Sequence, residues 1–277
     1  MEQQIVVGYD QTDRARVALA WAVDDARLRD ADLVVCHAWD VPYASVDRDV
    51  AHATRSFAKS TLDEGILLAR QGLPHHRVRP LLVQGPAGLV LTRASRTAAM
   101  VVVGTRGPGR RARLRLDSVS AHVVARARCP VTIVRGQQLP EAPDEPTLVV
   151  VAVDQSADAT TALGLAFEEA AWRRSDLHAW CGVWDNGPLI GGHTADPGAD
   201  PERQWLEETV PQWREKFPDV RVEAAFVGTH AASSMLNWED DVELVILSAR
   251  RAADALVVVD QVLRSQASFP VIITKDA

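Results

Sequence analysis

The 277-residue sequence has few of the features that mark secreted or membrane-spanning proteins. Its three cysteines (Cys36, Cys129 and Cys181) are too few for a disulfide framework, and none of them belongs to a Cys-X-X-Cys motif. The longest apolar runs, such as residues 100–104, have the length of a strand, whereas a helix that spans a membrane needs about 20 apolar residues. Polar residues at positions 2–4 also stand where a signal peptide would carry basic ones. We therefore expect a cytoplasmic protein with reduced thiols.

The composition disfavours a disordered or fibrous chain. Hydrophobic residues make up 47% of the sequence and charged residues 24%, and both values are near the globular average. The net charge of −7 is unevenly distributed: residues 1–140 hold 20 Lys and Arg against 13 Asp and Glu (+7), and residues 141–277 hold 10 against 24 (−14). A basic half is therefore joined to an acidic half. No nucleic-acid recognition motif accompanies the arginines, which makes nucleic acid an unfavoured partner.

The two halves repeat one pattern at an offset of about 144 residues. Residues 5–12 resemble residues 150–156, so that Asp10 corresponds to Asp154. Further matches follow in the same order: 18–26 with 162–170, 101–103 with 245–247, and 129–133 with 269–273. We predict a first domain over residues 1–138, a proline-containing linker over 139–147 and a second domain over 148–277.

Short apolar runs alternate with helical patterns in each half. The strands that we predict in the first half cover residues 5–8, 33–38, 79–83, 100–104 and 130–134. Strands that are apolar throughout are typical of a parallel sheet covered by helices on both faces. We therefore expect an α/β fold of two tandem doubly wound, Rossmann-like domains, each with a five-stranded parallel sheet. The helix before the fourth strand is predicted over residues 87–99. Ligands of such sheets bind beyond the carboxyl ends of the strands, where strand order reverses.

A glycine-rich segment follows the fourth predicted strand. Gly104, Gly107 and Gly109 lie within six residues, and a helix is predicted to begin at Ser118. Glycine lets a backbone approach a ligand closely, and the N-terminus of a helix binds phosphate groups. Neither the Walker spacing nor the Gly-X-Gly-X-X-Gly spacing occurs. On these residues alone, the segment is either a phosphate-binding loop or an ordinary glycine-rich connection.

The segment resembles the nucleotide loop of the universal stress protein family, in which Gly, two residues, Gly and nine residues lead to Gly-Ser/Thr. Here Gly104, two residues, Gly107 and nine residues lead to residues 117–120, Asp-Ser-Val-Ser. Val-Gly-Tyr-Asp at 7–10 and Ala-Arg-Cys-Pro-Val at 127–131 fit the same family. The resemblance covers essentially the whole chain. It implies two tandem domains, similar to the adenine nucleotide alpha hydrolases, which pack as an intramolecular pseudo-dimer and leave a homodimer open.

The resemblance also implies an ATP site in the first domain, with Mg²⁺ held through the phosphates themselves. It places Asp10 at the adenosine end and Ala38 against the base. The residues that it assigns to the phosphate loop are Gly104, Thr105, Arg106, Gly107, Ser118, Val119 and Ser120. From the residues alone, Asp10 has an alternative role as an acid that stabilises the start of the first helix.

One position departs from the family pattern, because Asp117 stands where the family has glycine. A carboxylate about 4 Å from a phosphate charge opposes binding by about 1 kcal/mol in water and about 4 kcal/mol at an intermediate dielectric. Five arginines between positions 106 and 115 act in the opposite direction. Whether ATP binds in the first domain therefore depends on how these charges balance.

The second half has lost the loop. Residues 248–251 read Ser-Ala-Arg-Arg where the first half has Gly-Thr-Arg-Gly, and no glycine follows. We therefore expect no nucleotide in the second domain.

The sequence also contains no recognisable catalytic group. It shows no candidate general base, and the adjacent His75 and His76 are poorly spaced for one metal ion, so we expect at most a slow ATPase and no metal site. The first hypothesis is a nucleotide-binding, stress-response regulatory module that acts on unidentified protein partners. The alternative is a scaffold of the same family that binds no nucleotide and acts through dimerisation and protein contacts.

Overall fold

The computed structural model describes residues 3–40, 48–105, 118–135, 147–153, 158–181, 201–226, 242–248 and 269–274. The chain divides into two compact units, the first over Met1–Glu141 and the second over Ala142–Asp276. This division falls inside the segment 139–147 that the sequence predicts as a linker. Each unit contains a parallel sheet with helices packed on it, which confirms the predicted α/β fold class.

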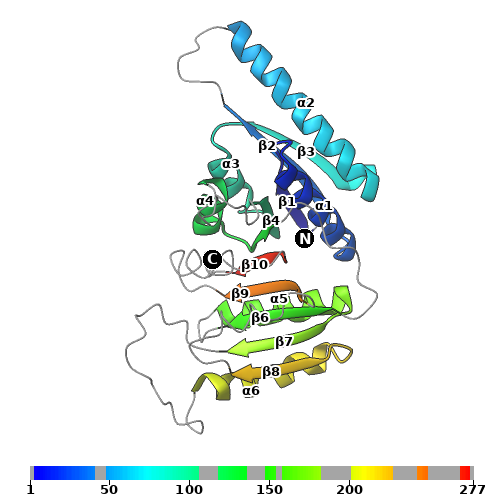
Figure 1. Ribbon diagram of the computed structural model, residues 1–277, viewed down its shortest axis with the longest axis vertical. Coiled ribbons are helices and arrows are strands. Elements are labelled where there is room, and N and C mark those ends of the chain that lie inside the picture. The colour runs from blue at the N-terminus through cyan, green and yellow to red at the C-terminus, as the bar shows by residue number, and fades with distance from the viewer. Residues whose placement is uncertain are drawn as a thin grey trace, which may run out of the picture. The chain divides into compact units, whose positions relative to one another are not determined.

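The first unit alternates strands and helices along the chain (Figure 1). Its elements are β1 (Gln4–Gly8), α1 (Asp13–Leu28), β2 (Asp32–Trp39), α2 (Arg48–Gly72), a short 3₁₀ helix (His75–Arg77), β3 (Val78–Gln84), α3 (Ala87–Ala94), β4 (Met100–Gly104), α4 (Ser118–Arg126) and β5 (Val131–Val134). The strands are parallel and lie in the order β3-β2-β1-β4-β5. Helices α1 and α2 cover one face of the sheet, and α3 and α4 cover the other (Figure 1). Strand order therefore reverses between β1 and β4.

The central strands of this sheet are buried because apolar side chains follow one another without a polar interruption. Ile5, Val6 and Val7 of β1 are at most 2% exposed. Each side chain of this size stabilises the fold by roughly 1.5–3 kcal/mol when it is fully buried. The register pairs Gly8 with Cys36 and Val7 with Val102, so the carboxyl ends of β1, β2 and β4 lie side by side.

Thr12 is the N-cap of helix α1, and its Oγ1 accepts a hydrogen bond of 3.4 Å from the backbone N–H of Ala15. Such a cap contributes about 1 kcal/mol. Val17, Ala18 and Trp21 follow at helical spacing and are buried. The cap and the apolar side chains together fix the first turn of α1 directly after β1.

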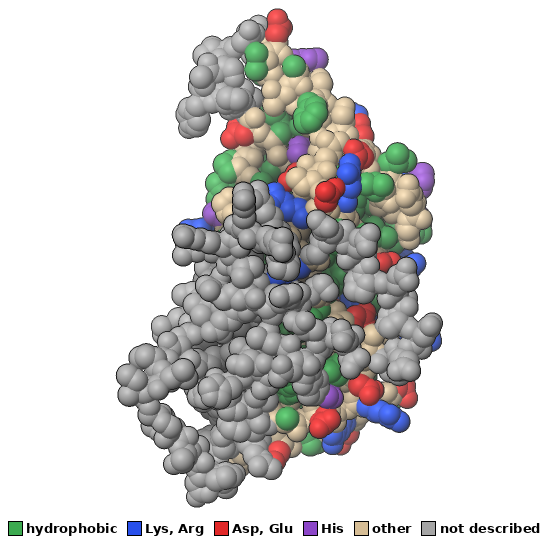
Figure 2. Space-filling model, in the orientation of Figure 1, with side chains coloured by type: hydrophobic (Ala, Val, Ile, Leu, Met, Phe, Trp, Pro, Cys, Tyr) green, Lys and Arg blue, Asp and Glu red, His purple; other side chains and the backbone are tan. Residues whose placement is uncertain are grey.

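Helix α2 packs on β2 and β3 but also presents apolar side chains to solvent. Leu62 and Ile66 are buried, whereas Phe57 is 69% and Leu67 65% exposed. Figure 2 shows hydrophobic side chains intermingled with acidic and basic ones on this part of the surface. Isolated apolar side chains of this kind are normal on protein surfaces.

Helix α3 ends at Ala94, so the predicted end at residue 99 was wrong. The Oγ of Ser95 donates to the carbonyl oxygen of Thr92 at 2.7 Å and accepts from the backbone N–H of Arg128 at 2.9 Å. The hydroxyl of Ser95 thus binds backbone groups of two segments where the helix ends.

The second unit repeats the strand order of the first. Its described elements are β6 (Leu148–Val153), α5 (Asp158–Arg173), β7 (Asp176–Cys181), α6 (Pro201–Lys216), β8 (Val222–Phe226), β9 (Val242–Ser248) and β10 (Val271–Thr274). The parallel strands lie in the order β10-β9-β6-β7-β8, which matches β5-β4-β1-β2-β3 element by element. The repeat in the sequence therefore corresponds to a repeat in topology.

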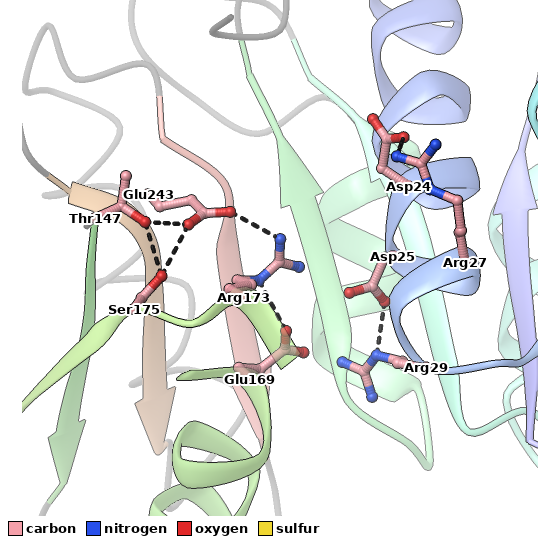
Figure 3. A network of polar contacts seen from close by, with 9 residues as sticks. All are labelled: Asp24, Asp25, Arg27, Arg29, Thr147, Glu169, Arg173, Ser175 and Glu243. Carbon is pink, nitrogen blue, oxygen red and sulfur yellow. Dashed lines mark hydrogen bonds and ion pairs between the residues drawn. The ribbon is translucent and has the colours of Figure 1, made fainter. Parts of the chain in front are cut away.

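A buried carboxylate–arginine pair occupies the same position of both repeats (Figure 3). In α1, Asp25 Oδ2 lies 2.8 Å from Arg29 Nε; in α5, Glu169 Oε2 lies 3.0 Å from Arg173 Nε. The four side chains are at most 6% exposed. Removing one partner of such a pair leaves a buried charge and costs about 3–5 kcal/mol. The framework of the two units is thus alike even in a buried polar detail.

Candidate functional site

A cavity of about 300 Å³ lies at the carboxyl ends of β1, β2 and β4 in the first unit. This is the end of the sheet at which strand order reverses, where doubly wound sheets bind their ligands. Its volume lies at the lower end of the range for small-molecule sites. The residues that line it are Gly8, Tyr9, Asp10, Arg14, Ala15, Cys36, His37, Ala38, Ala87, Leu91, Val103, Gly104, Ser118, Val119 and Ser120.

Three helices begin at this cavity. Helix α1 begins at Asp13 and lines the cavity through Arg14; α3 begins at Ala87, and α4 begins at Ser118. The first N–H groups of a helix have no partner within the helix, and the helix dipole adds partial positive charge there. Helix α3 begins without a side-chain cap, so none of its first N–H groups is occupied by a capping side chain. The cavity is therefore suited to an anionic ligand.

Asp10 follows β1 and lies at the edge of the cavity with its side chain half exposed. Its Oδ1 accepts hydrogen bonds from the backbone N–H of Thr12 at 3.2 Å and from Thr12 Oγ1 at 2.5 Å. Its Oδ2 lies 3.7 Å from Arg14 Nη2. Asp10 thus stabilises the start of α1, as the alternative role requires. A carboxylate has about four acceptor positions, so acceptor positions remain for a ligand hydroxyl.

Gly104 ends β4 where the backbone of α1 passes directly over it. A Cβ at this position would lie 2.3 Å from the carbonyl oxygen of Arg14 and 3.3 Å from the backbone nitrogen of Ala15. Only glycine fits this contact, which brings the end of β4 against the first turn of α1. Gly104 is therefore needed for the shape of the cavity.

The two serines at the start of α4 differ in whether a ligand can reach their hydroxyl groups. Ser120 is 1% exposed, and its Oγ donates to the carbonyl oxygen of Gly104 at 3.5 Å. Ser118 is exposed at the first position of the helix, and Val119 is partly exposed beside it. A ligand would therefore meet the hydroxyl of Ser118 and backbone N–H groups, while Ser120 joins α4 to the end of β4.

Thr105 does not line the cavity. Its side chain is 2% exposed, and its backbone N–H donates to the carbonyl oxygen of Val134 at 3.0 Å. Arg106, Gly107 and the departing Asp117 lie outside the described residues. Of the residues predicted for the site, Asp10, Ala38, Gly104, Ser118, Val119 and Ser120 come together in the cavity.

The end of β2 contributes two side chains beside the predicted Ala38. His37 Nδ1 lies 2.7 Å from the carbonyl oxygen of Tyr9, and because a carbonyl only accepts, Nδ1 carries the proton in this contact. Burial raises the pKa of the Cys36 thiol to about 12, so this thiol stays protonated and is a poor nucleophile. His37 and Arg14 were missed from the sequence, since neither belongs to a recognisable motif.

The part of the chain that the structure describes contains no group of three or more His, Cys, Asp or Glu side chains placed to hold a metal ion. Over the same residues, no helix is both long and apolar enough to pass through a membrane. In the second unit, Asp154 and the residues after Ser248 that replace the glycine loop lie outside the described ranges. The predicted loss of the glycine loop in the second domain therefore rests on the sequence alone.

Comparison with known proteins relates the whole chain to one family. The sequence model of the Universal stress protein family matches residues 1–135. A universal stress protein of Mycobacterium tuberculosis H37Rv is 29% identical over 294 residues, which cover 99% of this chain and 96% of that protein. Another from the same strain is 30% identical over 253 residues, which cover 90% and 86%. A universal stress protein of Mycolicibacterium smegmatis is 30% identical over 264 residues, which cover 90% and 87%.

The fold has a counterpart among solved structures. The crystal structure of a universal stress protein from Archaeoglobus fulgidus matches with a TM-score of 0.74 and 15% identity, over 99% of this chain and 98% of that one. At this identity the likeness concerns the fold, and it extends over both units. The identities of 30% to relatives matched over most of their length show that the chain belongs to the universal stress protein family.

Proposed function

We propose that the first unit binds an adenine nucleotide, ATP in particular, in the cavity at the ends of β1, β2 and β4. The observation that carries this proposal is the convergence of three helix N-termini on one cavity at the point where strand order reverses. Partial positive charge from these helices favours phosphate groups. Gly104 supports the same assignment, because its missing side chain lets strand and helix backbone meet at the cavity.

In the proposed complex, the two ends of the cavity bind different parts of the nucleotide. Asp10 would accept from the ribose hydroxyls and Ala38 would lie against the base, as the family resemblance implies. Ser118 and the N–H groups at the start of α4 would bind phosphate. Mg²⁺ would enter with ATP on the phosphate oxygens.

Two of the described lining residues are not activated for catalysis. Asp10 accepts two hydrogen bonds from Thr12, and the thiol of Cys36 stays protonated, so neither is an activated base or nucleophile. We therefore propose at most a slow ATPase, in which occupancy of the site changes the contacts of the protein with regulatory partners. The rival proposal is a scaffold that binds no nucleotide.

Calorimetric titration with ATP and Mg²⁺ tests the assignment of the site. Asp10→Ala should weaken ATP binding by about tenfold, which corresponds to the loss of a hydrogen bond to a charged group. Asp13→Asn is the matched control, because Asp13 is an exposed acid of the same turn that does not line the cavity. The affinity of the Asp13→Asn variant for ATP should stay within about twofold of that of the unmodified protein. Absence of binding to the unmodified protein would favour the scaffold, and equal losses in both variants would contradict the placement of Asp10.

A further inference from the structure

The turn that carries Asp10 has an unusual backbone. Gln11 has a φ of 64°, in the left-handed region that residues other than glycine rarely adopt. This conformation is strained for a residue with a side chain, so the surroundings of Gln11 must hold it. The residues that hold it come from helix α2, more than 45 positions later in the chain.

Helix α2 binds both ends of the Gln11 amide. Gln11 Nε2 donates to Glu64 Oε2 at 2.6 Å, and Gln11 Oε1 accepts from Thr61 Oγ1 at 3.1 Å. The side chain of Thr61 is buried, at 1% exposed. With donor and acceptor both engaged, the amide of Gln11 is fixed in one orientation.

Glu64 also binds the residue on the other side of Asp10. Tyr9 Oη donates to Glu64 Oε1 at 2.6 Å, and Arg16 Nη2 donates to the same oxygen at 2.9 Å. The Tyr9 ring packs over Gly65, where a Cβ would lie 2.7 Å from Tyr9 Cδ1. One carboxylate of α2 thus contacts the residues before and after Asp10 as well as the first turns of α1.

We propose that Glu64 is a positioning residue for the candidate nucleotide site, an inference that rests on the proposed function. Glu64 does not line the cavity. It acts through Tyr9 and Gln11, whose fixed positions hold the Asp10 carboxylate at the edge of the cavity. Helix α2 is thereby part of the binding apparatus, although the cavity is lined by other elements.

A double-mutant cycle in ATP binding tests the positioning role. Glu64→Gln keeps the size of the side chain but replaces one acceptor oxygen by a donor, and should weaken ATP binding by about fivefold. In the Asp10→Ala background the same change should alter affinity by less than about twofold, because its effect passes through Asp10. Asp63→Asn is the matched control, since Asp63 is an exposed neighbour that pairs with Lys59. Equal losses with and without Asp10 would overturn the proposal.

Hydrogen exchange of the protein without nucleotide separates this inference from the proposed function. In Glu64→Gln, the backbone amides of residues 10–12 should exchange about tenfold faster than in the unmodified protein or in Asp63→Asn. Unchanged exchange at these amides would refute the positioning role whether or not ATP binds. Faster exchange in a protein that binds no ATP would instead refute the proposed function and retain the role of Glu64 in holding the turn.

Discussion

Tyr9 and Glu64 each stabilise one protonation state of the other. Burial and the hydrogen bond to Glu64 raise the pKa of Tyr9 to about 12. Hydrogen bonds from Tyr9 and Arg16 hold the pKa of Glu64 below its ordinary value of 4.5. The folded protein therefore favours a protonated tyrosine and an ionised glutamate at the base of the Asp10 turn.

The lowered pKa of Glu64 makes its contribution to stability depend on pH. A carboxyl group whose pKa is lower in the folded state stabilises the fold above its unfolded pKa, and this contribution is lost as pH falls through the folded value. The difference in Tm between the unmodified protein and Glu64→Gln should therefore be largest near about pH 7 and shrink below about pH 4.5. Calorimetric melting across this range measures it. A difference in Tm that stays constant down to about pH 3 would mean that the contacts of the ionised Glu64 carboxylate do not stabilise the fold.

At the scale of single elements, the sequence predicts best what depends on neighbouring residues. The apolar run Met100–Gly104 predicted β4, which the structure contains. The glycine at its end was predicted to let the backbone approach a ligand, and its close contact with the backbone of α1 was not predicted. The end of α3 was missed because Ser95 is bound by the N–H of Arg128, which lies 33 positions away. The role of Glu64 was missed for the same reason, because it depends on contacts over 48 to 55 positions.

The contact between β4 and α1 allows a prediction about two glycines. Gly104→Ala should destabilise the protein by about 1–3 kcal/mol, because the new Cβ meets backbone that cannot move without displacing the start of α1. Gly8→Ala at the end of β1 is the matched control. The nearest atom there is a Leu91 methyl carbon at 3.2 Å, which a side-chain rotation can relieve. Urea denaturation should therefore show a smaller loss for Gly8→Ala. Equal losses would contradict the close approach of Arg14 to Gly104.

Across the whole molecule, the two repeats share framework features and differ in the glycines after the fourth strand and in net charge. Both have the same strand order and a buried carboxylate–arginine pair near the end of their first helix. A left-handed residue follows that helix in each, Asp30 with φ 54° and Arg174 with φ 58°. The glycines after the fourth strand occur in the first repeat alone, and the net charges of the two halves are opposite. Because the shared features serve folding, we expect the divergence to affect ligand binding and not the fold.

This divergence predicts one nucleotide per chain. Native mass spectrometry of the full chain with excess ATP and Mg²⁺ should show a single bound nucleotide, because residues 248–251 provide none of the glycines that the first repeat has at 104 and 107. Asp10→Ala should reduce the bound fraction, whereas Asp154→Ala, at the corresponding position of the second repeat, should leave it unchanged. A second bound nucleotide that disappears in Asp154→Ala would show that the second unit has kept a site without the glycine loop. The loop would then not be what distinguishes the two repeats in function.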